Sequence, residues 1–491
     1  MMGEMTCATG RRYRMSTTYT RRNFLKTAAL SIAAMGLPGI CKGQKSGKLP
    51  NFVIIFLDDS GWADFKPFGA PSYQTPNVEQ LAKDGCRFNN FYVPQAVCSA
   101  SRAALLSGCY PCRTKVFGAH PPRARGLDPG YATIGQVLKA RGYTTAVFGK
   151  WHIGDQPDTR PPARGFDESC GLMYSNDMWE FHPEDPKYWG KYPLQFWDNG
   201  KVTIERVTKE HQPMLTTWYT KHAVDFINRN KEKPFFLYVP HSMPHVPLFC
   251  SEKFKDKSGA GLYGDVMMEI DWSVGKIMEA LKANGVEDDT LVLFSSDNGP
   301  WISYGNHAGK TPFREAKGTS FDGGTRSACI IKYPRLIKAG TVSKNTFCSI
   351  DILPTLAYLA GASPPANPID GKNVWDLIVA VPGARNPHEY YPFSTGKTFE
   401  GVISSDGRWK LHLPHTYRTL VEAGRDGMPG KYTQREIELS LFDMENDPYE
   451  TTNVLDKYPQ VAERLKRYAE QHRQKFYMDD KARFSMLDSR P

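Results

Sequence analysis

The sequence predicts an α/β protein with a large mixed, mostly parallel β-sheet sandwiched by helices and a smaller C-terminal α+β subdomain. Short, wholly apolar runs of the kind that buried parallel strands produce recur along the chain, and stretches of helical periodicity separate them. The length of 491 residues, with 40% hydrophobic and 23% charged residues, is that of a globular protein and allows two or three domains. These proportions exclude a disordered chain, a coiled coil and collagen.

Four apolar runs are the predicted strands of this sheet, and a polar cluster follows each of them. A helix is predicted at 134–140, closed by Gly142, immediately before the second run. The runs and the residues that follow them are 52–57 with Asp58 and Asp59, 143–148 with Lys150 and His152, 235–239 with His241 and His245, and 291–295 with Asp297 and Asn298.

These polar clusters predict one shared site, because ligands bind beyond the carboxyl ends of the strands in an open parallel sheet. Together the clusters supply three Asp, one Asn, one Lys and two or three His. Carboxylate and amide oxygens suit a hard divalent cation, whereas lysine and imidazole suit an anionic substrate. Each residue alone could serve as a turn or cap residue, but the coincidence at four strand ends favours a functional site.

Residues 97–108 are predicted to form a loop that enters a short helix ending at Gly108. Cys98 then lies at or just before the helix N-terminus, where free backbone N–H groups and the helix dipole favour an anionic group. Arg102, one turn into the helix, adds a cation to the same spot. An ordinary structural cysteine before a capped helix is the alternative interpretation.

The net charge of +10 lies mostly at the N-terminus, where residues 1–45 hold eight Lys and Arg against one acidic residue. The remainder has 54 basic and 51 acidic residues, which argues against nucleic-acid binding. Arg21 and Arg22 begin a twin-arginine pattern, and the apolar stretch 28–40 suits a signal peptide but is too short to span a membrane. We therefore expect the twin-arginine export machinery to carry the protein to the periplasm or the extracellular space.

The ten cysteines are too sparse for a disulfide scaffold. Cys109 and Cys112 form a lone C-x-x-C, which favours a buried thiol pair or one disulfide over a zinc site. Cys41 stands in a poor context for a lipid anchor, so simple cleavage of the signal segment is favoured. No other hydrophobic run approaches membrane length, and we expect no stable membrane span.

Several motifs resemble the formylglycine-dependent sulfatases of the arylsulfatase A and N-acetylgalactosamine-6-sulfatase kind, in the alkaline phosphatase superfamily. Residues 98–102, CSASR, match the family signature C-x-P/A-S-R. Residues 406–410 and 441–448 resemble the small C-terminal sulfatase subdomain and extend the likeness to about 475. The other matching segments, in family order, are 58–62 (DDSGW), 149–154 (GKWHIG), 244–245 (PH), 296–299 (SDNG), 317–319 (KGT) and 323–326 (GGTR).

The resemblance implies an alkaline-phosphatase-like fold and a sulfuric ester hydrolase. In the family the signature cysteine is oxidised to formylglycine, so Cys98 is implied to become the nucleophile. One calcium ion is implied, with Asp58, Asp59, Asp297, Asn298 and the formylglycine at position 98 as its ligands, and oxygen-only ligands agree with that metal. Asp297 is also the implied acceptor of the proton of the attacking hydroxyl.

The resemblance also assigns roles to the cations and histidines. Arg102, Lys150 and Lys317, with the calcium ion, are implied to hold the sulfate oxygens in the transition state. His245, with Lys317, is implied to protonate the departing alcohol, and His152 to deprotonate the second hydroxyl so that sulfate is released. Lys150, His245 and Lys317 are therefore also expected to contact the substrate.

One residue departs from the commoner family pattern, and two other functions stay open. Ala100 stands where many members have proline, so either a formylglycine-generating enzyme or an anaerobic maturation enzyme is the expected partner. A phosphate or phosphonate ester hydrolase of the same superfamily is the first alternative, although such phosphatases usually use two zinc ions with several histidine ligands. The second is a catalytically dead glycan-binding protein, in which Cys98 would remain a thiol.

The substrate is expected to be a sulfated polysaccharide or oligosaccharide, because export suits a polymer too large to enter the cell. Residues 171–200 form an insert dense in aromatics, which suits stacking on sugar rings; packing of a long loop onto the sheet is the alternative. The aromatics of the insert are Tyr174, Trp179, Phe181, Tyr188, Trp189, Tyr192, Phe196 and Trp197.

We expect a signal peptide at 1–46, a catalytic domain at 47–385 and the C-terminal subdomain at 386–491.

Overall fold

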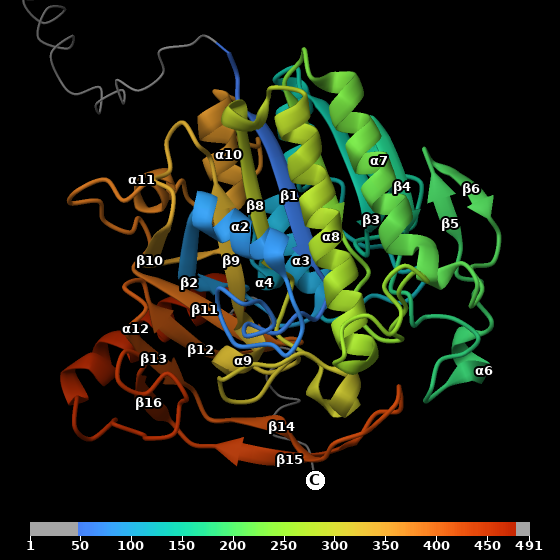
Figure 1. Ribbon diagram of the computed structural model, residues 1–491. Helices are drawn as coiled ribbons and strands as arrows, with labels where there is room; N and C mark the ends of the chain where they lie inside the picture. Colours follow the sequence, from blue (N-terminus) through green and yellow to red (C-terminus); the bar gives the residue numbers. More distant parts are fainter. Residues whose placement is uncertain (1–47, 478–491) are drawn as a thin grey trace, which may run out of the picture. The chain divides into compact units, whose positions relative to one another are not determined.

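The computed structural model describes residues 48–477, and a ten-stranded β-sheet runs through them (Figure 1). Within this sheet β9 and β5 run opposite to the other strands, which confirms the predicted mixed, mostly parallel sheet. In order across the sheet the strands are β10 (Thr341–Cys348), β2 (Cys86–Tyr92), β9 (Arg326–Lys332), β8 (Thr290–Ser296), β1 (Asn51–Leu57), β7 (Phe235–Pro240), β3 (Thr144–Lys150), β4 (Glu168–Leu172), β5 (Phe196–Asp198) and β6 (Lys201–Ile204).

The four predicted strands lie side by side in the middle of this sheet as β8, β1, β7 and β3. All are parallel: Ile54 of β1 pairs with Leu293 of β8 and Tyr238 of β7, and Leu237 of β7 pairs with Ala146 of β3. Nearly all of their residues are buried, which explains the uninterrupted apolar runs. Because parallel neighbours end at the same edge, the polar residues that follow them are brought together.

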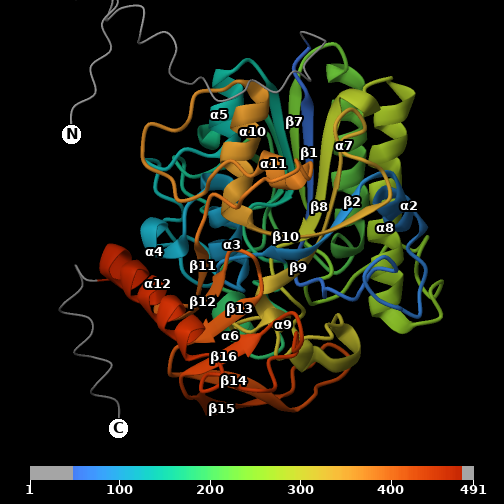
Figure 2. The ribbon, with the colours of Figure 1, turned by 90° about the vertical axis from the view of Figure 1, so that its left-hand side faces the viewer.

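Helices cover both faces of the sheet, as the side view in Figure 2 shows. One face carries α2 (Pro76–Asp84), α7 (Leu215–Asn230) and α8 (Gly261–Ala283), and the other carries α3 (Cys98–Ser107), α5 (Ile134–Ala140) and α10 (Ile352–Ala360). The shorter helical segments are α4 (Pro111–Thr114), η2 (Pro161–Arg164), α6 (Pro186–Trp189), η3 (Gln212–Met214), η4 (Glu287–Asp289), η5 (Ile302–His307), α9 (Asp322–Thr325), η6 (Ser349–Asp351) and α11 (Trp375–Ile378).

Local sequence signals explain where the two predicted helices begin and end. α5 starts with a capping box, in which the Thr133 hydroxyl accepts from the Gln136 amide and the Gln136 side chain accepts from the Thr133 amide. α3 begins at Cys98 and ends at Gly108, whose φ of 67° lies in the left-handed region that glycine adopts without steric cost. The structure confirms both predicted helices.

The smaller C-terminal subdomain is α+β, as predicted. Its four-stranded antiparallel sheet has the order β11 (Tyr390–Thr395), β12 (Thr398–Ser404), β13 (Trp409–His412) and β16 (Ser440–Asp443). α12 (Pro459–Tyr477) packs against this sheet through an apolar cluster that includes Val402, Leu411 and Leu465. A separate two-stranded ribbon is formed by β14 (His415–Glu422) and β15 (Lys431–Ile437).

A buried charge network fastens this subdomain to α9, the segment just before β9. The Lys410 ammonium group lies 2.7 Å from Asp322 Oδ1 and 3.0 Å from Glu450 Oε1. Glu450 also lies 2.8 Å from His412 Nε2 and accepts from the Asp322 amide at 2.8 Å. These side chains are fully or almost fully buried, so each charge depends on its partners for compensation.

Several sequence-based expectations fall outside the described residues, namely the signal segment 1–46 with Arg21 and Arg22, and Cys41. The predicted domain boundaries near 46 and 385 stay predictions. Among residues 48–477 no helix combines the length and apolar character needed to cross a membrane. The eight cysteines in this part of the chain, Cys109 and Cys112 included, are free and buried, so this C-x-x-C is a pair of buried thiols.

Replacement of Lys410 tests the buried network. Lys410→Met should lower the free energy of unfolding by about 3–5 kcal/mol, because it leaves Asp322 and Glu450 buried without their cation. Urea denaturation would measure the loss. Lys431→Met is the matched control, because its ion pair with Glu422 is exposed and should contribute little. An equal effect of the two substitutions would contradict the importance of the network.

Candidate active site

The carboxyl edge of the sheet contains all the residues that the sequence analysis singled out for metal binding and catalysis. They are fully or almost fully buried, with 6% the largest exposed fraction. Ion pairs, hydrogen bonds and mutual electrostatic effects connect them into one cluster. Their positions are Asp58 and Asp59 after β1, Cys98 and Arg102 in α3, Lys150 at the end of β3 with His152 after it, His245 after β7, Asp297 and Asn298 after β8, and Lys317 before α9.

The turn after β1 aims two carboxylates into the site. Asp59 has a φ of 64°, in the left-handed region. Gly61 permits close contact with the Lys310 backbone, since a Cβ at this position would lie 2.2 Å from the Lys310 carbonyl oxygen. Asp64 fastens the contact by accepting from the amides of Gly61 at 2.6 Å and Lys310 at 2.7 Å. The DDSGW segment is therefore a tight, internally bonded turn.

Carboxylates and cations are equal in number within the site, and each carboxylate has a cation beside it. The charges are fully buried, so this pairing offsets a desolvation cost of several kcal/mol per ion. The pairs are Lys150 Nζ with Asp58 Oδ2, Lys317 Nζ with Asp59 Oδ2 at 2.8 Å, and Arg102 Nη2 with Asp297 Oδ2 at 2.8 Å.

Two of these carboxyl groups differ widely in proton affinity. Burial opposes ionisation of Asp58, but Lys150, His245 and Arg102 together hold its pKa far below its usual range. Burial and the charge of Asp58 raise the pKa of Asp297 to about 7, although Arg102 opposes this effect. Asp58 is therefore ionised throughout the neutral range, and Asp297 is the carboxyl group that can take up a proton there.

Cys98, the first residue of α3, is 1% exposed. In the part of the chain that the structure describes, the amides of Cys98 and Ser99 have no acceptor, whereas the next two amides are bonded to carbonyl groups. Burial raises the pKa of the Cys98 thiol to about 11, although Lys150 and Lys317 act in the opposite direction. The unmodified thiol keeps its proton at neutral pH and is a weak nucleophile.

Arg102 is fully buried and directs its guanidinium group at the surrounding protein. Nε donates to Asp297 Oδ2 at 2.9 Å, Nη1 donates to the Lys150 carbonyl oxygen at 2.8 Å, and Nη2 lies 3.6 Å from Asp58 Oδ2. These contacts orient two carboxylates and the end of β3. Arg102 thus adds positive charge to the centre, and among the described residues its Nη2 makes ion pairs but no hydrogen bond.

His152 is a neutral imidazole with one free nitrogen. Nε2 lies 2.9 Å from the His120 carbonyl oxygen, which places the ring proton on Nε2. Nδ1 is buried and has no hydrogen-bond partner. Burial and the charge of Lys150 hold the pKa of His152 well below its ordinary value. A neutral ring with a free Nδ1 lone pair can accept a proton.

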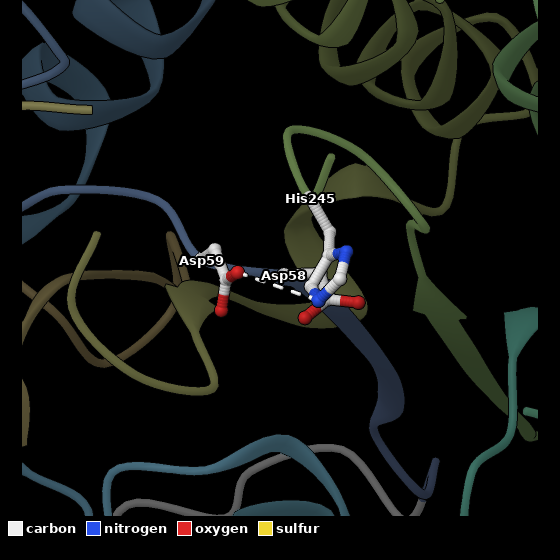
Figure 3. A group of neighbouring side chains, drawn as sticks. All are labelled: Asp58, Asp59 and His245. Atoms are coloured by element: carbon white, nitrogen blue, oxygen red, sulfur yellow. Dashed lines mark ion pairs between the residues drawn. The ribbon is translucent and has the colours of Figure 1, made fainter. Parts of the chain in front are cut away.

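His245 lies with its ring toward Asp58 and Asp59, as Figure 3 shows. Its Nδ1 is 2.5 Å from the Val246 carbonyl oxygen, and its Nε2 is 3.5 Å from Asp59 Oδ2. Burial and the charge of Lys317 lower its pKa, while the carboxylates oppose that effect. His241, the other histidine after β7, is fully buried with Nε2 3.2 Å from the Ser273 hydroxyl of α8.

Unpartnered oxygen atoms test whether the site fits a metal ion. Asp58 Oδ1 and Asn298 Oδ1 are fully buried and have no hydrogen-bond partner in the described part of the chain. The amide nitrogen of Asn298 donates to Asp59 Oδ1 at 2.7 Å, which leaves its oxygen free. Asp58, Asp59 and His245 each offer a ligand atom within 4.8 Å of the others. Buried oxygens without partners fit a hard cation such as calcium, whereas the imidazole nitrogen of His245 is a softer donor that this cation does not require.

The structure adds three residues to the site that the sequence analysis did not single out. The Ser175 hydroxyl accepts from Lys150 Nζ at 3.1 Å, and the His120 carbonyl binds His152. Trp301 lies beside His245, with ring centroids 5.5 Å apart, and the Lys317 ammonium group lies 4.2 Å from the Trp301 ring centroid. Ser175 belongs to the aromatic insert, but its neighbours gave no signal for a contact with Lys150.

The aromatic insert contains both packed and exposed rings. Tyr174, Trp179 and Phe196 are buried, so the packing interpretation holds for these three. Phe181 and Tyr188 are 47% and 39% exposed, which leaves rings on the surface near α6.

Comparison with known proteins finds sulfatases, both in a family model and in individual relatives. A family model described as Sulfatase matches residues 50–362, which contain every residue of the site. The chain is 35% identical over 462 residues to arylsulfatase A of Bos taurus, covering 89% of this chain and 88% of that protein. It is 33% identical over 490 residues to N-acetylgalactosamine-6-sulfatase of Mus musculus, covering 93% and 90%.

A solved structure adds a bacterial relative. Its description concerns the metabolism of multiple glycosaminoglycans by Bacteroides thetaiotaomicron, and the protein is 26% identical to this chain. The TM-score is 0.73, and the match covers 87% of this chain and 100% of the other.

Proposed function

The chain belongs to the sulfatase family and is a sulfatase, and from this premise we propose that it removes sulfate from a sulfated glycan, using a formylglycine made from Cys98 and one calcium ion. The observation that carries the proposal is the buried cluster around Cys98, where three carboxylates and three cations meet two histidines. This one set of side chains can bind an anionic ester, bind a metal ion and transfer protons.

Asp58, Asp59, Asp297, Asn298 and the formylglycine at position 98 are the proposed ligands of the calcium ion. When bound, the ion would offset the charge of these carboxylates and polarise the sulfate ester. The buried Asp58 Oδ1 and Asn298 Oδ1 support the proposal, because neither has a hydrogen-bond partner among residues 48–477.

The formylglycine would supply an oxygen nucleophile at the start of α3, where the thiol of Cys98 is protonated at neutral pH. Asp297 is the proposed acceptor of the nucleophile's proton, and the burial of its carboxylate in the same cluster as Cys98 supports that role. His152 is the proposed base for the later release of sulfate, through its free Nδ1.

Lys150 and Lys317 are proposed to bind the sulfate oxygens. A lysine ammonium group has three donors. Lys150 Nζ uses two of them on Asp58 and Ser175, and Lys317 Nζ uses one on Asp59. Each therefore keeps a donor for an anionic ligand, and Arg102 adds positive charge at the same place.

His245, assisted by Lys317, is the proposed donor of the proton that the departing alcohol needs. The contact between Nδ1 and the Val246 carbonyl fixes the ring, so that Nε2 faces the site. Nε2 lies 3.5 Å from Asp59 Oδ2, and the carboxylate favours the imidazolium ion, while burial and the charge of Lys317 lower the pKa of His245 and so favour release of the proton.

A sulfated polysaccharide or oligosaccharide is the proposed substrate. The glycosaminoglycan context of the Bacteroides thetaiotaomicron relative and the exposed Phe181 and Tyr188 support it. The twin-arginine pattern at Arg21 and Arg22 supports export to the periplasm or the extracellular space, with the export machinery and a maturation enzyme as partners.

Two measurements separate this proposal from its alternatives. Comparison of matched aryl sulfate and aryl phosphate esters would reveal a phosphate or phosphonate ester hydrolase. Intact mass of the purified protein distinguishes a dead glycan-binding protein, since conversion of a cysteine to formylglycine removes about 18 Da.

Replacement of Cys98 is expected to abolish sulfate-ester hydrolysis and leave the fold intact. Cys98→Ala removes the nucleophile, whereas a small side chain at the start of α3 costs little stability. Cys98→Ser should also be inactive if the maturation enzyme accepts only cysteine. Turnover of nitrophenyl sulfate and the thermal unfolding temperature are the readouts. An Ala variant that keeps more than about a hundredth of wild-type turnover, with contaminating sulfatase excluded, would remove Cys98 from the mechanism.

Chelation should remove most of the activity, and calcium should restore it better than zinc, because the proposed ligands are oxygen atoms. Calcium should also raise the thermal unfolding temperature of the chelated protein, since a ligand that binds the folded state stabilises it. Differential scanning calorimetry reads this shift independently of turnover. Recovery with zinc alone would favour the phosphatase alternative.

His245→Ala should affect two substrates differently. An alkyl alcohol on a sugar needs a proton as the S–O bond breaks, whereas nitrophenolate leaves readily without one. We expect hydrolysis of a glycan sulfate to slow by about 10²–10⁴-fold and hydrolysis of nitrophenyl sulfate to slow much less.

The ratio of the two losses identifies the role of His245. A histidine that merely binds sulfate would weaken both substrates alike. Equal losses would therefore transfer the acid role to Lys317 or to a residue outside the matched motifs, such as His241.

A further inference from the structure

A carboxylate beside the catalytic cluster is buried without a hydrogen bond. The Asp177 side chain is 10% exposed, and its Oδ1 atom has no partner. Its Oδ2 atom lies 3.8 Å from His182 Nε2, which is too long for a hydrogen bond. Asp177 follows Ser175 and Asn176 in the aromatic insert and was not among the candidate site residues of the sequence analysis.

The neighbouring His182 cannot supply the missing hydrogen bond to Asp177 without losing its own contacts. His182 Nδ1 accepts from the amides of Glu184 at 3.1 Å and Asp185 at 3.2 Å, so its ring proton lies on Nε2. The Nε2–H group therefore points toward Asp177, but the two amide contacts hold the ring at the longer distance. A donor from elsewhere is needed to complete the carboxylate's hydrogen bonds.

The segment that carries Asp177 is anchored to the catalytic machinery on both sides. Ser175 contacts Lys150 Nζ at 3.1 Å, and the Asn176 side chain donates to the Pro247 carbonyl at 3.1 Å, in the loop that also carries His245. Gln212 donates to the Asn176 carbonyl at 2.9 Å. The backbone at 177 thus has little freedom to turn its side chain toward water.

Asp177 follows directly after Asn176, whose side chain contacts the Pro247 carbonyl in the loop that carries His245. At this position the negative charge of Asp177 acts on the ring of His245. Since His245 is the proposed donor to the leaving alcohol, Asp177 belongs to the region that would surround the sugar.

Burying a carboxylate without a hydrogen-bond partner lowers the stability of the folded protein. Its presence beside a reaction centre therefore suggests that a bound ligand supplies the missing hydrogen bond. A sugar ring offers hydroxyl donors of this kind, whereas an aryl ester offers none next to its sulfate. A sulfate or carboxylate at the same position would meet the Asp177 charge at close range and be repelled.

We propose that Asp177 is a specificity-determining residue that accepts a hydrogen bond from a free hydroxyl of the sulfated sugar and disfavours a second anionic group at that position. The inference rests on the proposed glycan sulfatase function and narrows its substrate class. The favoured sugar carries its sulfate next to an unmodified hydroxyl, in contrast to a densely sulfated unit.

The test compares Asp177→Asn with Glu184→Gln, a matched loss of one negative charge from an exposed residue in the same insert. The probes are nitrophenyl sulfate and three sugars: galactose 6-sulfate, N-acetylgalactosamine 6-sulfate and N-acetylglucosamine 6-sulfate. The sugar that the wild type hydrolyses fastest is then compared with its deoxy analogue, which lacks the neighbouring hydroxyl, and with its disulfated analogue.

Asp177→Asn should lower kcat/KM on the monosulfated sugar by about tenfold or more, mainly through KM, because it replaces a charged acceptor by a neutral one. Nitrophenyl sulfate and the Glu184→Gln variant should change less than about threefold. The loss from Asp177→Asn should largely vanish on the deoxy sugar, since both changes remove the same hydrogen bond. The ratio of kcat/KM for the monosulfated sugar to kcat/KM for the disulfated sugar should fall in the Asn variant.

The contrary outcomes are distinct. Asp177 would be shown to support the loop and not to contact the substrate by either of two results. One is an equal loss of kcat/KM on sugar and aryl sulfates, and the other is a loss of kcat/KM that persists in full on the deoxy sugar. A lowered thermal unfolding temperature in Asp177→Asn would point to the same structural role. A wild-type enzyme that hydrolyses nitrophenyl sulfate but no sugar probe would contradict this inference alone, and one that hydrolyses neither would contradict the proposed function as well.

Discussion

The burial of six charged side chains at one edge of a parallel sheet is the constraint on which the rest of this structure depends. Each charge would be unstable there alone, so the three carboxylates and three cations must arrive together in fixed geometry. The sheet supplies that geometry, because β8, β1 and β3 end at one edge and deliver Asp297, Asp58 and Lys150. Arg102 enters from α3 and Lys317 from the loop before α9, which closes the cluster from outside the sheet.

The need to hold Lys317 against Asp59 explains the place of the C-terminal ribbon. Arg418 of β14 donates to the Lys317 carbonyl oxygen, and a Cβ at Gly318 would lie 2.5 Å from the same guanidinium group. Gly318 also has a φ of 81°, so glycine satisfies two requirements at this position. The small subdomain thus contributes to the site through backbone support for a cation, although its residues up to 477 donate no side chain to the cluster.

The sequence could predict the central strands and the carboxylates that follow them because both leave strong local patterns. Strands buried on both faces produce unbroken apolar runs, and Asp58 or Asp297 then appears as an abrupt change of polarity. The strand β2 alternates buried and half-buried residues and leaves a weaker pattern. The contact of His152 with a His120 main-chain oxygen leaves no trace in residue type, and Ser175 reaches Lys150 through the course of a long insert. Such contacts become evident when the chain is folded.

His152 and His245 show why residue type alone would not separate the proposed acid from the proposed base. Burial lowers the pKa of both, so pKa direction does not separate them. The hydrogen bonds do: His152 is bonded through Nε2 and leaves Nδ1 free, whereas His245 is bonded through Nδ1 and leaves Nε2 facing Asp59. The carboxylate of Asp59, 3.5 Å from Nε2 of His245, favours the imidazolium form and suits the proposed proton donor. At His152, burial and the charge of Lys150 outweigh the carboxylate of Asp58, which suits the proposed base. The proposed difference in role therefore depends on the charged side chains around each ring, and the loops after β3 and β7 set those surroundings.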